Sequence, residues 1–356
     1  MRVAVIGVGL IGGSIGLAAR QRLEADVAGF DPAPGVLDAA LARGAVQEAA
    51  ESVRGALAGA DTAFVAAPVG ALPAAVGHAL DAAAADCVVS DVGSTKRAVV
   101  AAHDDPRFVG GHPLAGAETA GVEHARADLF EGATWYLTPA ATTAGTLFER
   151  LHRTITGFGA RPTAIDPAEH DRLLAHVSHL PHVLANVLVT QAAQALAAGD
   201  HRLPATGPSF RDATRVAGAN GAIWTDIYLS NRDAIVEQLD DTARRLREVR
   251  DALAAADAPG IAAWNDRAAE DRRRLLETDL EGGPVHELRV SVPNQPGVLA
   301  RIALELGRAG INIDDMALYP AADMREGVVA LWIGGEEEAA RAHELAASLG
   351  FPVARA

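Results

Sequence analysis

A glycine-rich turn near the start of the chain is the feature that most constrains its fold. Residues Gly7–Gly12 follow the pattern G-x-G-x-x-G, after the apolar run Arg2–Ile6 and before a helical stretch. In this setting the glycines allow a tight turn, a close approach of backbone to a pyrophosphate and close packing of helix on strand. The helix N-terminus offers N–H groups to the phosphates. The pattern predicts a dinucleotide site at Gly7, Gly9, Leu10, Ile11 and Gly12, with a ligand-free turn as the alternative.

An acidic residue, Asp31, follows the second apolar run, Asp26–Phe30. A carboxylate at this position accepts hydrogen bonds from the adenosine ribose and repels a 2′-phosphate, so it predicts NAD rather than NADP as the cofactor. Because Pro32 comes next, Asp31 is also suited to start a turn or cap a helix. The two roles are compatible.

Strands and helices alternate through the first expected domain, residues 1–166. Continuous apolar strands between helices are typical of a Rossmann-type, doubly wound parallel sheet covered on both faces. The strands are expected at Arg2–Ile6, Asp26–Phe30, Asp61–Ala66, Asp86–Ser90, Phe108–Gly110 and Thr134–Leu137. The helices are expected at Gly13–Arg22, Gly35–Arg43, Leu72–Leu80 and Lys96–His103.

Two further domains are expected after residue 166. Residues 167–281 are rich in alanine and leucine at helical spacing, as in Ile235–Leu253, and predict an all-α domain. The segment Glu281–Pro284 is typical of a linker. Residues 285–356 predict a small α+β domain with the ferredoxin-like order βαββαβ. Its strands are expected at His286–Val292, Asn312–Leu318, Gly327–Ile333 and Phe351–Val353, and its helices at Val298–Gly310 and Glu336–Leu349.

The composition excludes several classes of protein. A formal net charge of −15 disfavours nucleic acid and anionic membranes as partners. Cys87 is the single cysteine, so no intrachain disulfide can form, as is usual in a reducing cytosol. The N-terminus lacks the pattern of a signal peptide, and no uninterrupted apolar run is long enough to span a membrane. A cytoplasmic location is therefore expected.

Two polar segments follow predicted strands of the first domain, where doubly wound sheets bind ligands. In Ser90–Lys96, Ser94 either lines such a site or, like Asp91, caps a helix. In Gly110–Glu118, His112 lies between glycines and a proline, so little bulk surrounds it. A histidine there can exchange a proton near neutral pH, and a structural role is the alternative.

Histidines and arginines mark the helical domain. His176, His179 and His182 recur every three residues, but Pro181 should disrupt the helix that would align them as metal ligands. No metal is expected, and the favoured interpretation has at least one of them facing the nucleotide crevice.

Arg211 and Arg215 are four residues apart and share a helix face. A buried arginine requires an anionic partner. That partner is either Asp212 or Glu118, or a carboxylate of the substrate held by two hydrogen bonds.

Taken together and in this order, the motifs resemble the prephenate/arogenate dehydrogenases of tyrosine biosynthesis. The resemblance extends from Arg2 to about Leu280, and its most specific parts are the HPLAG and VSHLPH sequences. The matching stretches are Gly7–Ser14, Asp31, Asp91–Lys96, Gly110–Gly121, His170–His182 and Phe210–Arg215. The resemblance implies NAD-linked oxidative decarboxylation of a cyclohexadienol, with prephenate as the expected substrate and arogenate as the alternative. A non-catalytic regulator that binds NAD and amino acids is the rival from a different class.

The resemblance also implies roles for particular residues. His112 would accept the hydroxyl proton, and Ser94 would orient that histidine or the hydroxyl group. His179 would be the second histidine of the site. Arg215 would bind a substrate carboxylate, and an acidic group, Glu118 or Asp212, near the side chain would favour arogenate. Some relatives have a glycine-rich stretch where this chain has Gly207–Ser209.

The C-terminal domain resembles an ACT domain, a fold that commonly binds amino acids between two copies. The turn that opens its first helix supplies the expected effector residues Asn294, Gln295 and Gly297. The helix N-terminus beside them is suited to bind a carboxylate. We expect a homodimer inhibited by an aromatic amino acid, most plausibly L-tyrosine, with a purely structural dimerisation module as the alternative.

Overall fold

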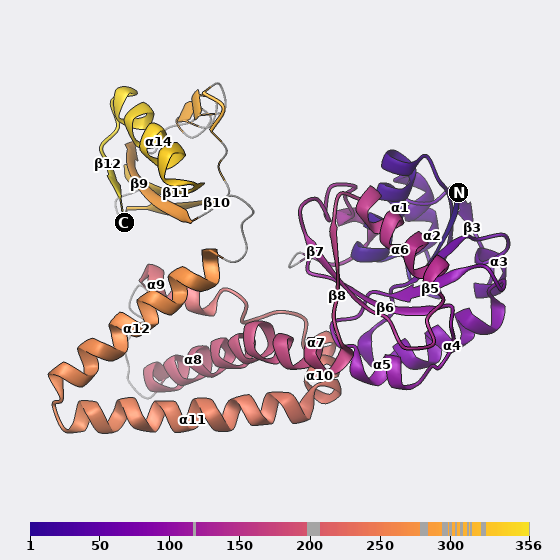
Figure 1. Ribbon diagram of the computed structural model, residues 1–356, viewed down its shortest axis with the longest axis horizontal. Helices are drawn as coiled ribbons and strands as arrows, with labels where there is room; N and C mark the ends of the chain where they lie inside the picture. Colours follow the sequence, from indigo (N-terminus) through magenta and orange to yellow (C-terminus); the bar gives the residue numbers. More distant parts are fainter. Residues whose placement is uncertain are drawn as a thin grey trace. The chain divides into compact units, whose positions relative to one another are not determined.

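The chain was analysed as a computed structural model (Figure 1). It describes residues 1–116, 119–197, 207–277, 284–293 and 325–355, and, between the last two ranges, 298, 301–302, 305–306, 309–311, 313 and 315–321. Two compact units are present, Met1–Ala243 and Arg244–Ala356. Each is described by itself below.

An eight-stranded sheet forms the centre of the first unit, in the order β3-β2-β1-β4-β5-β6-β7-β8. Its strands are β1 (Arg2–Ile6), β2 (Asp26–Phe30), β3 (Glu48–Ala49), β4 (Thr62–Val65), β5 (Val88–Asp91), β6 (Phe108–Pro113), β7 (Thr134–Thr138) and β8 (Arg161–Ala164). The predicted doubly wound sheet is confirmed for β1 to β6. Strands β3 and β8 were missed, because β3 has two residues and β8 is mostly exposed.

One strand pair departs from the predicted parallel arrangement. Strand β7 runs antiparallel to β6, with His112 opposite Tyr136, while β7 and β8 are parallel to each other. The connection between β6 and β7 contains only the short 3-10 helix η2 (Val122–His124) among its described residues. Antiparallel neighbours need no crossover helix, so this connection can reverse the chain direction.

Helices cover both faces of the sheet (Figure 1). One face carries a core with side chains from α1 (Leu10–Leu23), α2 (Val36–Ala42) and α6 (Gly145–Gly157). The other face packs against α3 (Val53–Ala56), α4 (Leu72–Ala82), which follows the 3-10 turn η1 (Val69–Ala71), and α5 (Arg97–Ala101). Strands buried on both faces explain why their sequences are continuously apolar.

The turn between β1 and α1 requires glycine at two positions. Gly7 has φ = +88°, and a Cβ there would lie 2.3 Å from the Ala66 carbonyl oxygen. A Cβ on Gly12 would lie 1.9 Å from the Gly7 carbonyl oxygen and 3.0 Å from the side chain of Val5 in β1. Helix and strand approach each other this closely because neither glycine has a side chain.

A long helical segment follows the sheet. Helix α7 (Pro167–Leu174) continues through a π turn, η3 (Ala175–His179), into α8 (Leu180–Ala197). The predicted disruption of the helix at Pro181 is therefore wrong, because a wider turn directly precedes the proline and the helix goes on. By length and composition alone, Pro167–Ala195 could cross a membrane, and 28% of its most apolar window is buried.

Shorter and longer helices complete the α-helical region: α9 (Pro208–Thr214), α10 (Gly221–Ser230), α11 (Arg232–Ala254) and α12 (Ala258–Glu277). Helix α10 begins at an N-cap, Asn220, whose side chain accepts hydrogen bonds from the N–H groups of Ala222 and Ile223. The second unit begins within α11.

The end of the chain forms a separate antiparallel sheet in the order β10-β11-β9-β12. Its elements are β9 (Val285–Pro293), β10 (Asp315–Pro320), β11 (Glu326–Gly334), α14 (Glu336–Ser348) and β12 (Val353–Arg355). Its core includes side chains of β9, β11 and α14. The predicted helix Val298–Gly310 lies partly outside the described residues, and within it residues 298, 301, 302, 305 and 306 are helical.

Candidate active site

A buried ion pair marks the carboxyl end of β5. Asp91 and Lys96 contact each other, and both side chains are fully buried. The Asp91 carboxylate also accepts hydrogen bonds from the N–H groups of Gly93, at 2.8 Å, and Gly111 in β6, at 3.1 Å. Burial lowers the pKa of Lys96, and its contact with Asp91 opposes that change. The pair joins the ends of two neighbouring strands at the edge where such sheets bind ligands.

His112 lies near the end of β6, and only 8% of its surface is exposed. Its Nδ1 is 2.9 Å from Nε2 of His170, whose Nδ1 is 2.8 Å from Oδ1 of Asp171. Burial, together with the charges of His170, Lys96 and His179, holds the pKa of His112 well below its ordinary value. His112 is therefore neutral near pH 7, the form that can accept a proton.

Helix α7 positions the two partners of His112. Its N-cap is Asp166, whose carboxylate accepts hydrogen bonds from the N–H groups of Ala168 and Glu169, and Pro167 is well suited to the first helical position. His170 and Asp171 are then the fourth and fifth residues of the helix, where both are buried.

The N-terminus of α5 is capped from α7. One oxygen of Asp171 accepts a hydrogen bond from the N–H of Lys96 at 2.7 Å, and the other from the N–H of Arg97 at 2.9 Å. The predicted capping role of Ser94 or Asp91 is therefore wrong, because a carboxylate from another helix satisfies these N–H groups. Ser94 itself is half-buried at a bend before the helix.

His179 ends the π turn and belongs to the same buried region. Asn231 donates its side-chain N–H groups to the carbonyl of Asp171, at 2.7 Å, and to Nδ1 of His179, at 3.1 Å. Burial lowers the pKa of His179 to about 4, although the charge of Asp171 opposes the shift. Because Nδ1 accepts a hydrogen bond, neutral His179 carries its proton on Nε2.

The other two histidines of the series lie in different surroundings. His182 stacks on the indole of Trp224 with ring centroids 3.5 Å apart, and its Nδ1 lies 2.8 Å from the hydroxyl of Tyr228. His176 is exposed and lies 2.8 Å from the carbonyl of Arg172. Among the described residues no cluster of three histidine, cysteine or acidic side chains could hold a metal ion.

The predicted substrate-binding arginine is exposed rather than buried. Arg215 follows α9, and both it and Arg211 face solvent in this chain. The argument that burial requires a carboxylate partner is therefore wrong for these residues. Asp212 is exposed as well, and Glu118 lies outside the described residues. The predicted effector residues Asn294, Gln295 and Gly297 also lie outside them.

The residues of the glycine turn fit a dinucleotide. Nothing lies within 4 Å of a Cβ built on Gly9, so the backbone there is open to a ligand. Helix α1 has Gly9 as its N-cap without a side-chain hydrogen bond, which leaves N–H groups for phosphate oxygens. The Asp31 carboxylate accepts hydrogen bonds from the N–H groups of Val8 and Ala33, each at 2.8 Å. Its predicted role in starting a turn is thus confirmed, and its contact with the ribose stays a prediction.

Four residues of the buried region were not proposed as site residues from the sequence: Lys96, His170, Asp171 and Asn231. His170 and Asp171 stood inside a recognised motif, and their adjacency was the available signal. Asn231 lies in no motif, and only the folded chain brings it to His179.

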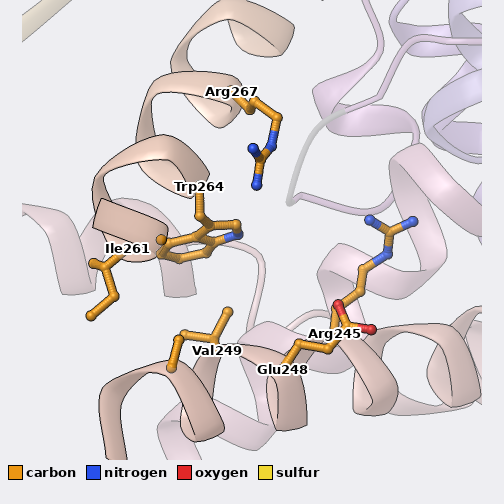
Figure 2. A pocket seen from close by; sticks show the side chains of 8 residues that line it. Arg245, Glu248, Val249, Ile261, Trp264 and Arg267 are labelled. Atoms are coloured by element: carbon orange, nitrogen blue, oxygen red, sulfur yellow. The ribbon is translucent and has the colours of Figure 1, made fainter. Parts of the chain in front are cut away.

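A separate cavity of about 300 Å³ lies between α11 and α12 (Figure 2). The indole of Trp264 extends between the two helices, and the guanidinium groups of Arg245 and Arg267 face the same space. The complete lining is Arg245, Glu248, Val249, Ala252, Gly260, Ile261, Trp264 and Arg267. It contains none of the residues predicted from the sequence.

A dinucleotide turn on a doubly wound sheet, with a buried neutral histidine at the carboxyl edge, defines the NAD-linked dehydrogenases as a class. Within that class, the chain belongs to the prephenate dehydrogenase family. The family model of the prephenate dehydrogenase nucleotide-binding domain matches residues 15–164, and the model of the dimerization domain matches residues 166–265. The ACT domain model matches residues 286–330.

Individual relatives agree with the family assignment. A prephenate dehydrogenase of Bacillus subtilis is 31% identical over 96% of this chain and 94% of its own length. A cyclohexadienyl dehydrogenase of Zymomonas mobilis is 31% identical over 78% of this chain and 96% of its own. The crystal structure of prephenate dehydrogenase from A. aeolicus with hydroxyphenyl propionate and NAD+ has a TM-score of 0.72 and 25% identity, covering 77% of this chain and 98% of that one.

Proposed function

We propose that this protein catalyses the NAD-dependent oxidative decarboxylation of prephenate to 4-hydroxyphenylpyruvate. The observation that carries the proposal is the buried, neutral His112 at the carboxyl edge of the sheet that also bears the dinucleotide turn. NAD, when bound, accepts the hydride from the ring carbon that bears the hydroxyl group. The family assignment supports prephenate as the substrate.

His112 supplies the proton transfer that the reaction needs. Removing the hydroxyl proton favours loss of hydride from the same carbon and contributes a factor of about 10²–10⁴ in rate. Loss of carbon dioxide then leaves the ring aromatic, with its oxygen as a phenolate. The proton returns from His112 to that oxygen, so the histidine is neutral again at the end of the cycle and no net proton is released.

Three other side chains complete the proposed site. Ser94, at the bend after β5, orients the hydroxyl group or His112. His179 contributes a neutral ring with an N–H on Nε2, suited to donate a hydrogen bond to a carboxylate. Arg215 binds a second carboxylate, because a guanidinium can form two parallel hydrogen bonds with one. Glu118 and Asp212 are the candidates for contacts with the substrate side chain.

The protein is proposed to act as a cytoplasmic homodimer with L-tyrosine as its amino-acid effector. Exposed apolar side chains on the helical region support dimerisation, since a second copy would remove them from water. They include Val187, Leu188, Ile223, Leu229 and Val236. The effector would bind at Asn294, Gln295 and Gly297 in the C-terminal domain.

A spectrophotometric assay tests the proposed function. The purified protein is mixed with NAD and either prephenate or arogenate, and the absorbance of reduced nicotinamide is followed. We expect turnover of prephenate with a kcat/KM at least about tenfold above that for arogenate, a difference of about 1.4 kcal/mol in transition-state binding. A preference for arogenate would identify arogenate, not prephenate, as the substrate. No turnover of either compound would contradict the proposed function.

A further inference from the structure

A continuous series of hydrogen bonds leads from the N-terminus of α5 to His112. It passes from the N–H groups of Lys96 and Arg97 to Asp171, from Asp171 to His170, and from His170 to His112. Asp171, His170 and His112 are 2%, 0% and 8% exposed as whole residues. Water therefore does not compete for these hydrogen bonds.

The direction of each hydrogen bond follows from the ionised state of Asp171. Burial alone would raise its pKa, but hydrogen bonds from His170 and from the two N–H groups of α5 hold the pKa below its ordinary value. An ionised carboxylate only accepts hydrogen bonds, so Nδ1 of His170 carries a proton. With Nδ1 as its proton-bearing nitrogen, His170 accepts at Nε2, and Nδ1 of His112 donates to it. The lone pair of His112 is left on Nε2.

We propose that Asp171 and His170 are positioning residues that hold His112 in the tautomer with a free lone pair on Nε2, a role that rests on the function proposed above. They also stabilise the imidazolium that forms when Nε2 takes the hydroxyl proton. The positive charge then lies on a ring hydrogen-bonded through His170 to an anion. Without that anion, a charge forming at this buried position would lack a partner, which is costly.

The charged groups around His112 come from several elements. Asp91 and Lys96 at the end of β5 pair with each other, while His179 of the π turn carries no charge at neutral pH. Asp171 of α7 is thus the anion connected to His112 by hydrogen bonds. Its removal should lower the affinity of His112 for a proton.

The substitution Asp171→Asn tests the proposal with little change in shape. Asparagine removes the negative charge that stabilises the imidazolium of His112, while its oxygen can still accept from the Lys96 N–H and from Nδ1 of His170. We expect kcat with prephenate and NAD to fall about 100-fold or more. The KM for prephenate and the dissociation constant for NAD should stay within about threefold, because neither ligand contacts Asp171 in this proposal.

Asp166→Asn is the matched control. It makes the same change on the same helix, to a carboxylate that also caps helix N–H groups but has no link to His112. It should leave kcat unchanged. In addition, the pH at which kcat/KM falls on the acid side should move lower in Asp171→Asn, whereas a loss of folded protein would lower the rate at every pH equally.

Nitrogen NMR of the histidine rings provides a readout that does not depend on activity or on a variant. At pH 7 the wild-type spectra should show His112 and His170 protonated on Nδ1 and not on Nε2. A proton on Nε2 of His112, or a kcat for Asp171→Asn within about threefold of wild type, would overturn the proposal. If only the proposed function is wrong, the histidine rings should give the expected spectra, and the protein should turn over neither prephenate nor arogenate.

Discussion

His112 is a histidine whose surroundings suppress its charge, and we predict that this sets the pH range of the enzyme. A general base must be unprotonated to act, and burial holds the pKa of His112 well below 6.5. We therefore predict that kcat/KM for prephenate stays constant from pH 8 down past pH 6.5 and falls only at lower pH. A half-maximal value at or above pH 6.5 would contradict this.

Removing the base tests the same residue directly. His112→Asn should lower kcat by about 10²–10⁴-fold while NAD still binds, because only the proton transfer is lost. His176→Asn, at an exposed histidine of the same region, is the control and should leave kcat unchanged. Near-normal turnover in His112→Asn would remove His112 from the mechanism.

At the residue scale, we predict that Asp31 determines the cofactor preference. Its carboxylate should repel the 2′-phosphate of NADP, so wild type should prefer NAD and Asp31→Ser should narrow the preference about tenfold or more, equal to about 1.4 kcal/mol. Asp38→Ser, at an exposed carboxylate on α2, should leave the kcat/KM ratio for the two cofactors as it is. Equal use of both cofactors by wild type would show that Asp31 does not discriminate.

At the scale of elements, the π turn between α7 and α8 puts a histidine where it resists protonation. The pKa of His179 falls from 6.5 in the unfolded chain to about 4 in the fold. Between these values the unfolded chain binds the proton and the folded chain does not, so stability falls as the pH drops from about 6.5 to 4. The contribution of this residue amounts to about 3 kcal/mol.

Urea unfolding at several pH values measures this effect. The free energy of unfolding of His179→Gln should decrease less than that of wild type between pH 7 and pH 4, by about 3 kcal/mol. His176→Gln is the matched control, because that histidine is exposed and should leave the wild-type pH dependence in place. Parallel curves for His179→Gln and wild type would contradict the prediction.

Elements with a repeating pattern could be predicted from the sequence, and elements that depend on distant contacts could not. Strands β1 and β2 were predicted to the residue because each is a continuous apolar run beside a turn. The antiparallel direction of β7 and the π turn before Pro181 have no such periodic pattern in the sequence. In the site, glycine spacing indicated the dinucleotide turn, whereas the cap that Asp171 provides to α5 joins residues 75 positions apart.

At the scale of the whole molecule, the C-terminal sheet has its own core, and none of its strands belongs to the eight-stranded sheet. Deleting residues 285–356 should therefore leave the catalytic residues in place. We predict that the truncated protein retains turnover and loses inhibition by L-tyrosine, measured as the concentration that halves the rate. Equal inhibition of the full-length and the truncated protein would mean that L-tyrosine binds at the active site. No inhibition of either protein would contradict the effector proposal.

The π turn η3 also sets the direction, around the helix axis, in which the side chains of α8 point. His170 and His179 are nine residues apart, which in a regular α-helix is about two and a half turns and would place them on opposite sides. A π turn takes more residues per revolution, so it reduces the angle between them and lets both enter one buried cluster. In evolutionary terms it is equivalent to a single inserted residue. Losing that residue would leave the two histidines eight residues apart in a regular α-helix, about 80° from each other, so both would still face one side of the helix.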